Sequence, residues 1–380
     1  MRNKTHPPKV LLLAEYDCVS GTRTYAKQLI AFYAQNKYDL TVVARGPVED
    51  EEMTLYCQSN GVRLLHHADV AVGNLEFKTQ PWRLARERRT LDAFITEHQF
   101  NIIVASVGTP GLFLGHMGLG RCSIYILHTY PKLVRPKWRR LLKRCIWAAL
   151  IPKDIYFLTV SQFSKTRMLD AWGLWHSQRN VSVIHSSTGE TMIATTPVVN
   201  DGYIHVLTVG HVIKYKNPML WIDAAALALK QMPNLRFTWV GPGPLVESCR
   251  QHVENLGLRE KILFVGSSID VHKYYQACDI YTQPSSIESL GLSVLDAMRH
   301  GKPCVVTNTG GLPELVCSGE SGWIVNTDDH HELARRIIQL AKNPTERAQM
   351  GRHGQHIYAN RFNYKRWETE MQLLHKSVLV

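Results

Sequence analysis

The chain has 380 residues, of which 45% are hydrophobic and 20% charged, and its formal net charge is +12. This length exceeds what one hydrophobic core ordinarily serves, so we expect two domains of similar size, and the globular composition excludes a low-complexity chain. The excess of positive charge predicts an anionic partner, namely nucleotide phosphates, a membrane leaflet or nucleic acid.

The first half of the chain alternates between strand and helix patterns. Residues 9–14 form a continuous apolar run, typical of a strand buried on both faces of a parallel sheet. A short loop leads to Gly21, and a helical pattern follows before the next strand at residues 39–44. This unit of strand, glycine loop, helix and strand predicts a doubly wound α/β domain. A further helix is expected at residues 83–98, and strands at 102–105, 123–127, 155–160 and 181–184.

A second alternation begins at residue 205. We expect strands at 205–209, 236–240, 262–265, 280–283 and 304–307, and helices at 218–230, 292–299, 332–342 and 366–377. Residues 191–204 lack periodicity and are interpreted as a linker. The predicted domains are therefore 1–190 and 205–360, with a C-terminal helix in 361–380 that packs back toward the first domain. Ligands of open parallel sheets bind beyond the carboxyl ends of the strands, so the expected site is the cleft between the domains.

The cysteines and the apolar runs indicate a cytoplasmic location. The eight cysteines are scattered and form no cluster with the spacing of a zinc site, which predicts buried thiols in a reducing cytosol. No apolar run has the length needed to span a bilayer. The first run ends at Glu15 and is interpreted as a strand rather than a signal peptide.

Residues 283–315 carry the densest set of features. A helix is expected to begin near Gly291, where free backbone N–H groups and the helix dipole would bind a diphosphate. Glu288 precedes this helix by about one turn, and Asp296 lies roughly 7 Å further along it. That is about the offset between a pyrophosphate and its ribose. A carboxylate there can accept hydrogen bonds from the two vicinal hydroxyls of the ribose. Either acid alone would be interpreted as a solvated surface residue, but the run of features favours a donor site.

The same stretch resembles the E-x7-E signature of family 4 retaining glycosyltransferases, which have the GT-B fold: two Rossmann-like doubly wound domains facing across a cleft. The likeness covers nearly the whole chain, because further family motifs follow in order. They are Ser20-Gly21, His128 at a strand end, Val160-Ser161, Val209-Gly210 to Lys216-Asn217, residues 239–244 and 263–266, Pro284-Ser285, and residues 310–314.

The resemblance implies a metal-independent hexosyltransferase that retains the anomeric configuration and needs no cofactor. It would move a sugar from a nucleotide-sugar to a glycan or lipid-linked acceptor, in the synthesis of surface or extracellular polysaccharide. The first domain would bind the acceptor and the second the donor. The implied catalytic residues are Glu288, which holds sugar hydroxyls, and His128, which faces the reacting sugar. The implied donor-binding residues are Ser20, Gly21, His211, Lys216, Leu290, Gly291, Leu292 and Asp296.

Three positions depart from the family pattern. Asp296 stands where the family has a second Glu and is one methylene shorter. His211 stands where the family has Arg, which weakens the phosphate clamp while the imidazole is neutral. Ser20 replaces a Gly and restricts the backbone there. One alternative is therefore a non-catalytic relative that binds nucleotide-sugar. The other, a nicotinamide-dependent oxidoreductase, predicts G-x-G-x-x-G after the first strand, which residues 15–21 lack.

A basic segment accounts for much of the net charge. Residues 98–153 contain nine basic residues and no Asp or Glu. One helical face there is apolar, and the other carries Lys137, Arg139, Arg140, Lys143 and Arg144. The functional interpretation is peripheral contact with the anionic inner face of a membrane, and the alternative is a core-packed helix with a solvated basic face. Nucleic acid is disfavoured as a partner, because no stacking-aromatic motif accompanies the charge.

Overall fold

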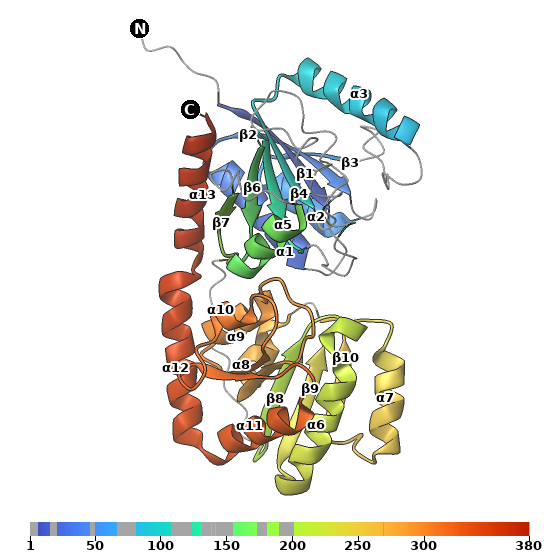
Figure 1. Cartoon of the computed structure of the whole chain (residues 1–380), viewed down its shortest axis with the longest axis vertical. Helices are drawn as coiled ribbons and strands as arrows, with labels where there is room; N and C mark the ends of the chain where they lie inside the picture. The colour runs from blue at the N-terminus through green and yellow to red at the C-terminus, as the bar shows by residue number, and fades with distance from the viewer. Residues whose placement is uncertain are drawn as a thin grey trace. The chain divides into compact units, whose positions relative to one another are not determined.

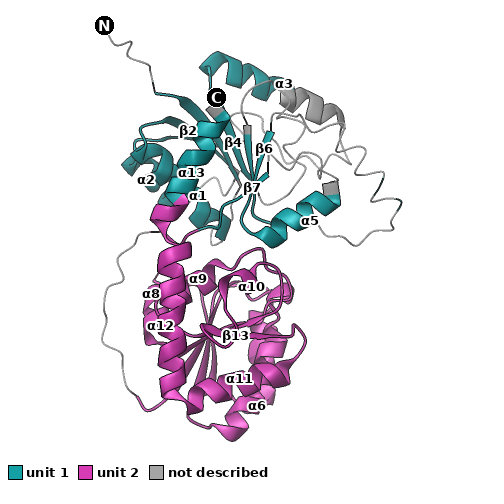
Figure 2. Ribbon diagram, turned by 60° about the vertical axis from the view of Figure 1, so that its left-hand side comes forward, with its two compact units in different colours: residues 1–186, 368–380 teal, residues 187–367 magenta. Residues whose placement is uncertain are grey.

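The computed structural model describes residues 7–15, 21–45, 50–66, 81–107, 123–130, 138, 141, 155–172, 181–189, 201–268 and 270–379. By its internal contacts the chain divides into unit 1, residues 1–186 and 368–380, and unit 2, residues 187–367 (Figure 2). Most of the predicted linker, residues 191–200, lies outside the described residues. Among the described helices, none has the length and hydropathy that crossing a membrane requires.

Unit 1 is built on a seven-stranded parallel sheet in the order β3-β2-β1-β4-β5-β6-β7. The strands are β1 (Lys9–Glu15), β2 (Asp39–Arg45), β3 (Arg63–His66), β4 (Ile102–Val107), β5 (Ser123–Leu127), β6 (Ile155–Thr159) and β7 (Val181–Val183). The helices between them are α1 (Gly21–Gln35), α2 (Glu51–Ser59), α3 (Pro81–His98) and α5 (Gln162–Trp172). Strand β1 is central, and its residues Val10, Leu11 and Leu12 are fully buried, as its unbroken apolar run predicts.

The helix α13 (Tyr364–Leu379) completes unit 1 from the far end of the sequence. The hydroxyl of Tyr33, on α1, lies 2.8 Å from Nε2 of the buried His375. Gln372 Nε2 also donates to Asn36 Oδ1 at 2.9 Å. The last turns of the chain therefore pack against the C-terminal end of α1.

Unit 2 repeats the architecture with a six-stranded parallel sheet in the order β10-β9-β8-β11-β12-β13 (Figure 1). Its strands are β8 (Ile204–Val209), β9 (Leu235–Val240), β10 (Ile262–Gly266), β11 (Ile280–Gln283), β12 (Cys304–Thr307) and β13 (Gly322–Val325). Its helices are η2 (Lys214–Lys216, 3-10), α6 (Pro218–Gln231), α7 (Val246–Asn255), α8 (His272–Ala277), α9 (Leu292–Arg299), α10 (Leu312–Leu315), α11 (His330–Lys342) and α12 (Pro344–Arg361).

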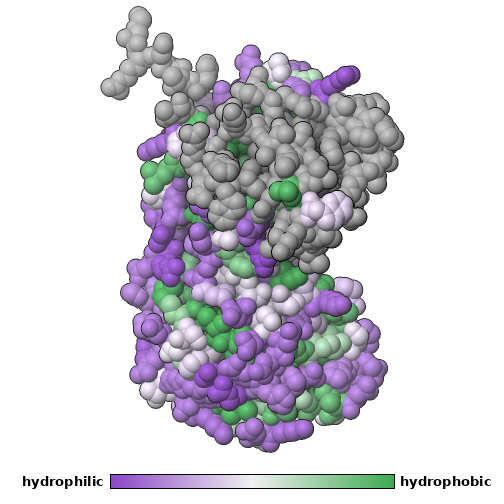
Figure 3. Space-filling view, in the orientation of Figure 1, coloured by the Kyte–Doolittle hydropathy of each residue, from purple (hydrophilic) through white to green (hydrophobic). Residues whose placement is uncertain are grey.

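The core of unit 2 contains an aromatic cluster on one side of the sheet. The indole of Trp221, on α6, makes edge contacts with the rings of Phe237 and Trp239, on β9. Its Nε1 donates to Thr282 Oγ1 at 2.9 Å, so the buried N–H group is satisfied. Outside, hydrophilic residues surround scattered hydrophobic ones over the described part of the surface in Figure 3. The Trp221 indole thus joins α6 to the sheet.

The predicted fold class, two doubly wound parallel α/β domains, is confirmed by these two sheets. The predicted cleft concerns the relation between the units and stays a prediction. The basic residues Lys137, Arg139, Arg140, Lys143 and Arg144 lie outside the described residues. Of the apolar face beside them, Trp138 and Leu141 are described, and both are 62% exposed.

Candidate functional site

The candidate site lies where the strand order of unit 2 reverses. Strands β8 and β11 are neighbours in the sheet, but the strands that follow them in sequence are added toward opposite edges: β9 and β10 beside β8, and β12 and β13 beside β11. The segment after β8 begins with Gly210 and His211, and the segment after β11 leads to Glu288. Open α/β sheets bind their ligands at such a switch point, beyond the carboxyl ends of the strands. The topology therefore brings two of the predicted motifs to one edge of the sheet.

An ion pair joins the two motifs. Lys216 ends the 3-10 helix η2, and its Nζ lies 2.5 Å from Glu288 Oε2. Both side chains are largely shielded, with 14% and 15% of their surface exposed. The backbone N–H of Ser286 donates to Tyr215 O at 2.8 Å and ties the two loops together beside the pair. A cation and an anion thus lie in contact at the predicted donor site.

The helix α9 begins next to this pair. Gly291 is its N-cap residue with φ of +106°, a conformation that side-chain-bearing residues rarely adopt. The first hydrogen bond of the helix runs from Val294 N to Gly291 O at 3.0 Å, so the N–H groups of Leu292 and Ser293 come before it. These are the groups that helix starts present to anions. Leu290 is buried just ahead of them.

The Gly310-Gly311 pair holds the backbone of Glu288. Gly311 N donates to Glu288 O at 3.3 Å. A Cβ atom added to Gly310 would lie 1.5 Å from the same oxygen, so the position has room for glycine alone. The motif that follows β12 therefore sets the path of the loop on which Glu288 stands.

Asp296 lies on α9, one helical turn beyond the helix start. Burial raises the pKa of its carboxyl to about 7, although a hydrogen bond with Thr188 and the charge of Arg299 both favour the ionised form. Its Oδ1 is buried and has no hydrogen-bond partner among the residues that the structure describes. A buried acceptor without a partner is costly. A donor such as a ribose hydroxyl would satisfy it, which is consistent with the role predicted for Asp296.

His211 follows β8, and its backbone is fixed by its neighbour, because Val212 N donates to Pro242 O at 2.8 Å. Its side chain is partly buried. Lys214, three residues after His211, is exposed on η2, whereas Lys216 points to Glu288. Of the cations in η2, Lys216 is therefore the one that the site contains.

Unit 1 brings together two other predicted residues. Gly21 is the first residue of α1, and Tyr25, one turn later, places its ring 4.7 Å from the ring of His128. His128 follows β5, and its Nε2 lies 2.8 Å from Ser106 Oγ, on β4. Burial lowers the pKa of His128 to about 4, so the imidazole is neutral at pH 7. Ser20 lies outside the described residues.

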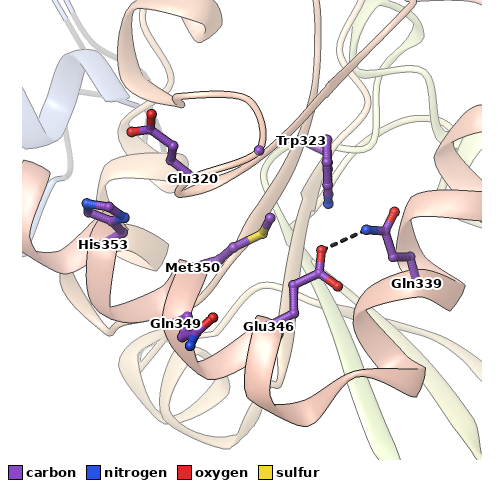
Figure 4. Close-up of a pocket in the computed structure, with 8 residues that line it drawn as sticks. Glu320, Trp323, Gln339, Glu346, Gln349, Met350 and His353 are labelled. Atoms are coloured by element: carbon purple, nitrogen blue, oxygen red, sulfur yellow. Dashed lines mark hydrogen bonds between the residues drawn. The ribbon is translucent and has the colours of Figure 1, made fainter.

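A pocket of about 460 Å³ lies elsewhere in unit 2, on β13, α11 and α12 (Figure 4). Its polar side chains are partly engaged with one another, because Gln339 Nε2 donates to Glu346 Oε1 at 2.7 Å. None of the predicted donor-binding residues lines it. The residues that line it are Gly319, Glu320, Trp323, Gln339, Glu346, Gln349, Met350 and His353.

Several residues that support the site were not predicted from the sequence as site residues. Ser106 contacts His128, Thr188 contacts Asp296, and Gln283 reaches Glu288 through Ser285. The sequence does contain a signal for Gln283. Its strand is expected to be buried, and a buried side-chain amide requires a hydrogen-bond partner. For Ser106 and Thr188 the partners are distant in sequence.

Comparisons with known proteins agree with this geometry. Residues 194–357 match the family described as glycosyl transferases group 1. The chain is 33% identical over 156 residues to EpsD of Bacillus subtilis (strain 168), covering 41% of each chain. It is 35% identical over 147 residues to the Vi polysaccharide biosynthesis protein VipC/TviE of Salmonella typhi, covering 36% of this chain and 25% of that one.

The whole chain resembles a solved structure. Anabaena Alr3699/HepE, solved in complex with UDP and glucose, matches with a TM-score of 0.76 and 21% identity over 97% of this chain and 100% of that one. At this identity the likeness shows the fold alone. The chain spans about two fifths or less of the length of the curated relatives named above. Residues 194–357 therefore match the glycosyl transferases group 1 family, and the chain as a whole has the GT-B fold.

Proposed function

We propose that the protein is a retaining glycosyltransferase of the family 4 type, which transfers a hexose from a nucleotide-sugar to a glycan or lipid-linked acceptor. The observation that carries this proposal is the contact of Lys216 with Glu288 beside the start of α9. UDP and glucose in HepE, and the polysaccharide named for VipC/TviE, support a nucleotide-sugar donor and a role in surface or extracellular polysaccharide synthesis.

The chemistry follows from where charge develops. Transfer breaks the bond between the anomeric carbon and the leaving phosphate oxygen, so negative charge grows on the diphosphate. The Lys216 ammonium and the N–H groups at the start of α9 are donors placed to stabilise that charge, and the reaction needs no metal ion for it. Glu288 then holds hydroxyls of the sugar, and Asp296 holds those of the ribose.

Retention of configuration follows from attack by the acceptor hydroxyl on the face that the diphosphate leaves. The acceptor oxygen bonds to the anomeric carbon, and its proton passes to the departing phosphate oxygen, so that atoms and charge balance. In this mechanism His128 of unit 1 faces the same sugar as a neutral hydrogen-bonding group, because its pKa of about 4 keeps it uncharged. Gly21 lets the start of α1 approach the donor without a side chain between them.

The test begins with a thermal-shift panel of nucleotide-sugars, because a ligand that binds only the folded state raises its melting temperature. The donor that stabilises most is then offered with glycan and lipid-linked acceptors, and the configuration of the product is determined by NMR. Glu288→Ala should abolish transfer and leave the circular dichroism spectrum unchanged. A chain that neither binds nor turns over any nucleotide-sugar contradicts the proposed function, and near-normal turnover by Glu288→Ala contradicts the role of that residue.

We also propose that the basic segment contacts an anionic membrane surface, where a lipid-linked acceptor would be met. Trp138 and Leu141, each 62% exposed, are apolar residues among the cations of that segment. Aromatic and aliphatic side chains beside Lys and Arg are typical of surfaces that bind lipid headgroups. Sedimentation with phosphatidylglycerol vesicles, but not with phosphatidylcholine vesicles, is the expected result. Replacing Lys143 and Arg144 by Glu should abolish it.

A further inference from the structure

We infer that Gln283 is a positioning residue for Glu288, acting through the hydroxyl of Ser285, and this rests on the proposed function of Glu288. The contacts form one continuous path. Gln283 Nε2 lies 2.8 Å from Ser285 Oγ, and Ser285 Oγ lies 3.3 Å from Glu288 Oε2. Oε2 is the same carboxylate oxygen that receives the Lys216 ammonium. Glu288 is therefore held from two sides, by a cation and by a buried hydroxyl.

The direction of the path is determined by the Glu288 carboxylate, which accepts hydrogen bonds and has none to donate when it is ionised. Ser285 Oγ therefore donates its single proton to Glu288 Oε2 and accepts from the amide nitrogen of Gln283. This orientation leaves the amide oxygen facing Tyr281 OH at 2.6 Å and Ser293 Oγ at 3.1 Å. The amide of Gln283 therefore holds the Ser285 hydroxyl in the orientation that donates to the carboxylate.

The burial of this path shows what the amide contributes. Tyr281, Gln283 and Ser285 are all 0% exposed. A buried amide is costly unless hydrogen-bonded, and an apolar side chain of similar volume would fill the same space without that requirement. Packing alone therefore does not account for Gln283. What the amide adds is a hydrogen bond that orients the Ser285 hydroxyl toward Glu288.

The loop backbone is held by a different residue, so the path can be tested separately. Thr307 Oγ1, on β12, donates to Ser285 O at 2.5 Å, and a second contact reaches Gln283 O at 3.3 Å. Neither bond uses the side chain of Gln283 or Ser285. Replacing the Gln283 side chain is therefore expected to release the hydroxyl of Ser285 and not to move the loop.

A double-mutant cycle tests the inference with Gln283→Met, Ser285→Ala and the double variant. Each single change should lower kcat for transfer about tenfold, as expected for loss of a hydrogen bond to a charged group. Because both changes remove the same path, the double variant should also lose about tenfold and not about a hundredfold. The affinity for the nucleoside diphosphate should stay within about twofold of the native value, since Lys216 and the backbone N–H groups at the start of α9 are unchanged.

The control is Thr208→Val, which removes a buried hydroxyl that bonds with Thr282, on the opposite face of β11. This variant should lose stability and keep its kcat. Losses that multiply in the double variant, full activity of Gln283→Met, or a Gln283→Met that loses diphosphate affinity along with kcat would each overturn the inference.

A binding measurement separates this inference from the proposed function. The ratio of the affinities for nucleotide-sugar and nucleoside diphosphate reports how well Glu288 holds the sugar, even without turnover. Gln283→Met should lower that ratio about tenfold. A native chain that binds no nucleotide-sugar contradicts the proposed function and, with it, this inference. A native chain that binds the donor, with Gln283→Met unchanged in the ratio, contradicts the inference alone.

Discussion

Lys216 Nζ lies 2.5 Å from Glu288 Oε2, so the group expected to bind the donor's diphosphate is paired with the group expected to bind its sugar. A diphosphate that enters the site must share or take over the ammonium. The proposed function then implies that Glu288 competes for Lys216 in the free protein and is freed to bind hydroxyls as the phosphates arrive.

Removing either partner should have opposite effects on diphosphate binding. Lys216→Gln should weaken the affinity for a nucleoside diphosphate roughly 10- to 100-fold, the loss expected for a hydrogen bond to a charged group. Glu288→Gln should leave that affinity equal or higher, because the ammonium is released, and should abolish transfer. Isothermal titration calorimetry measures both. Lys214→Gln, on the exposed side of the same short helix, is the control and should bind normally.

The Asp296 carboxylate should be needed for nucleotide binding, whereas its length should matter less. Asp296→Glu should retain binding, and Asp296→Ala should lose it, because the ribose hydroxyls then have no acceptor. Equal affinity for all three forms, measured by calorimetry with the nucleoside diphosphate, would mean that the ribose is held elsewhere.

The same carboxyl should make nucleotide affinity depend on pH. Its pKa of about 7 leaves it largely protonated at pH 6 and ionised at pH 8, and only the ionised form accepts from both ribose hydroxyls. The affinity should therefore rise between pH 6 and 8. In Asp296→Asn, which does not titrate, this part of the rise should disappear; an identical rise in the variant would contradict the assignment.

Protonation of His128 should destabilise unit 1 in acid. The pKa of His128 in the folded chain is about 4, below the ordinary value of 6.5, so folding favours the neutral form. The stabilisation is complete above pH 6.5 and is lost as the pH falls toward 4, by about 3 kcal/mol at most. Calorimetric unfolding of His128→Gln, which stays neutral, should show a correspondingly smaller loss between pH 7 and 4.5. A loss as large as in the native chain would show that other groups are responsible.

Gly310→Ala should disturb the site through its clash with Glu288 O. The substitution adds both left-handed strain and a Cβ atom 1.5 Å from that oxygen. Gly257→Ala, at φ of +68° with open space around it, adds only the strain, about 1 kcal/mol. Denaturation should therefore show a clearly larger loss for Gly310→Ala, together with lower transfer activity. Equal stability losses for the two variants would mean that the loop yields without cost.

The sequence predicted the central strands well, because burial on both faces leaves an unbroken apolar run. The observed bounds of β5, β11 and β12 agree with the predicted ranges. The strands β3 and β13 were not predicted: each has four residues, and β3 is a partly exposed edge strand. The helix α12 was also missed, because its sequence contains two glycines. One of them, Gly351, lies so close to Gly301 that a Cβ atom would fall 2.0 Å from Gly301 O, so packing there overrides helix propensity.

For the site, the motifs predicted which residues take part but not which residues they contact. Glu288 and Lys216 were expected to bind different parts of the donor, and their ion pair depends on how η2 meets the loop after β11. The raised pKa of Asp296 depends on burial, which a helix pattern alone does not reveal. The path from Gln283 to Glu288 joins the end of a strand to two side chains of the loop that follows it, and such side-chain contacts are known only from coordinates.

The contact between Tyr33 and His375 has a consequence for biosynthesis. Unit 1 includes residues 368–380, and these leave the ribosome only after all of unit 2 has been translated. At roughly 5–20 residues per second, the nascent first unit waits on the order of ten seconds or more without its closing helix. During that interval the surface of α1 that α13 covers is open to chaperones. The unit whose synthesis begins first is therefore completed no earlier than the second.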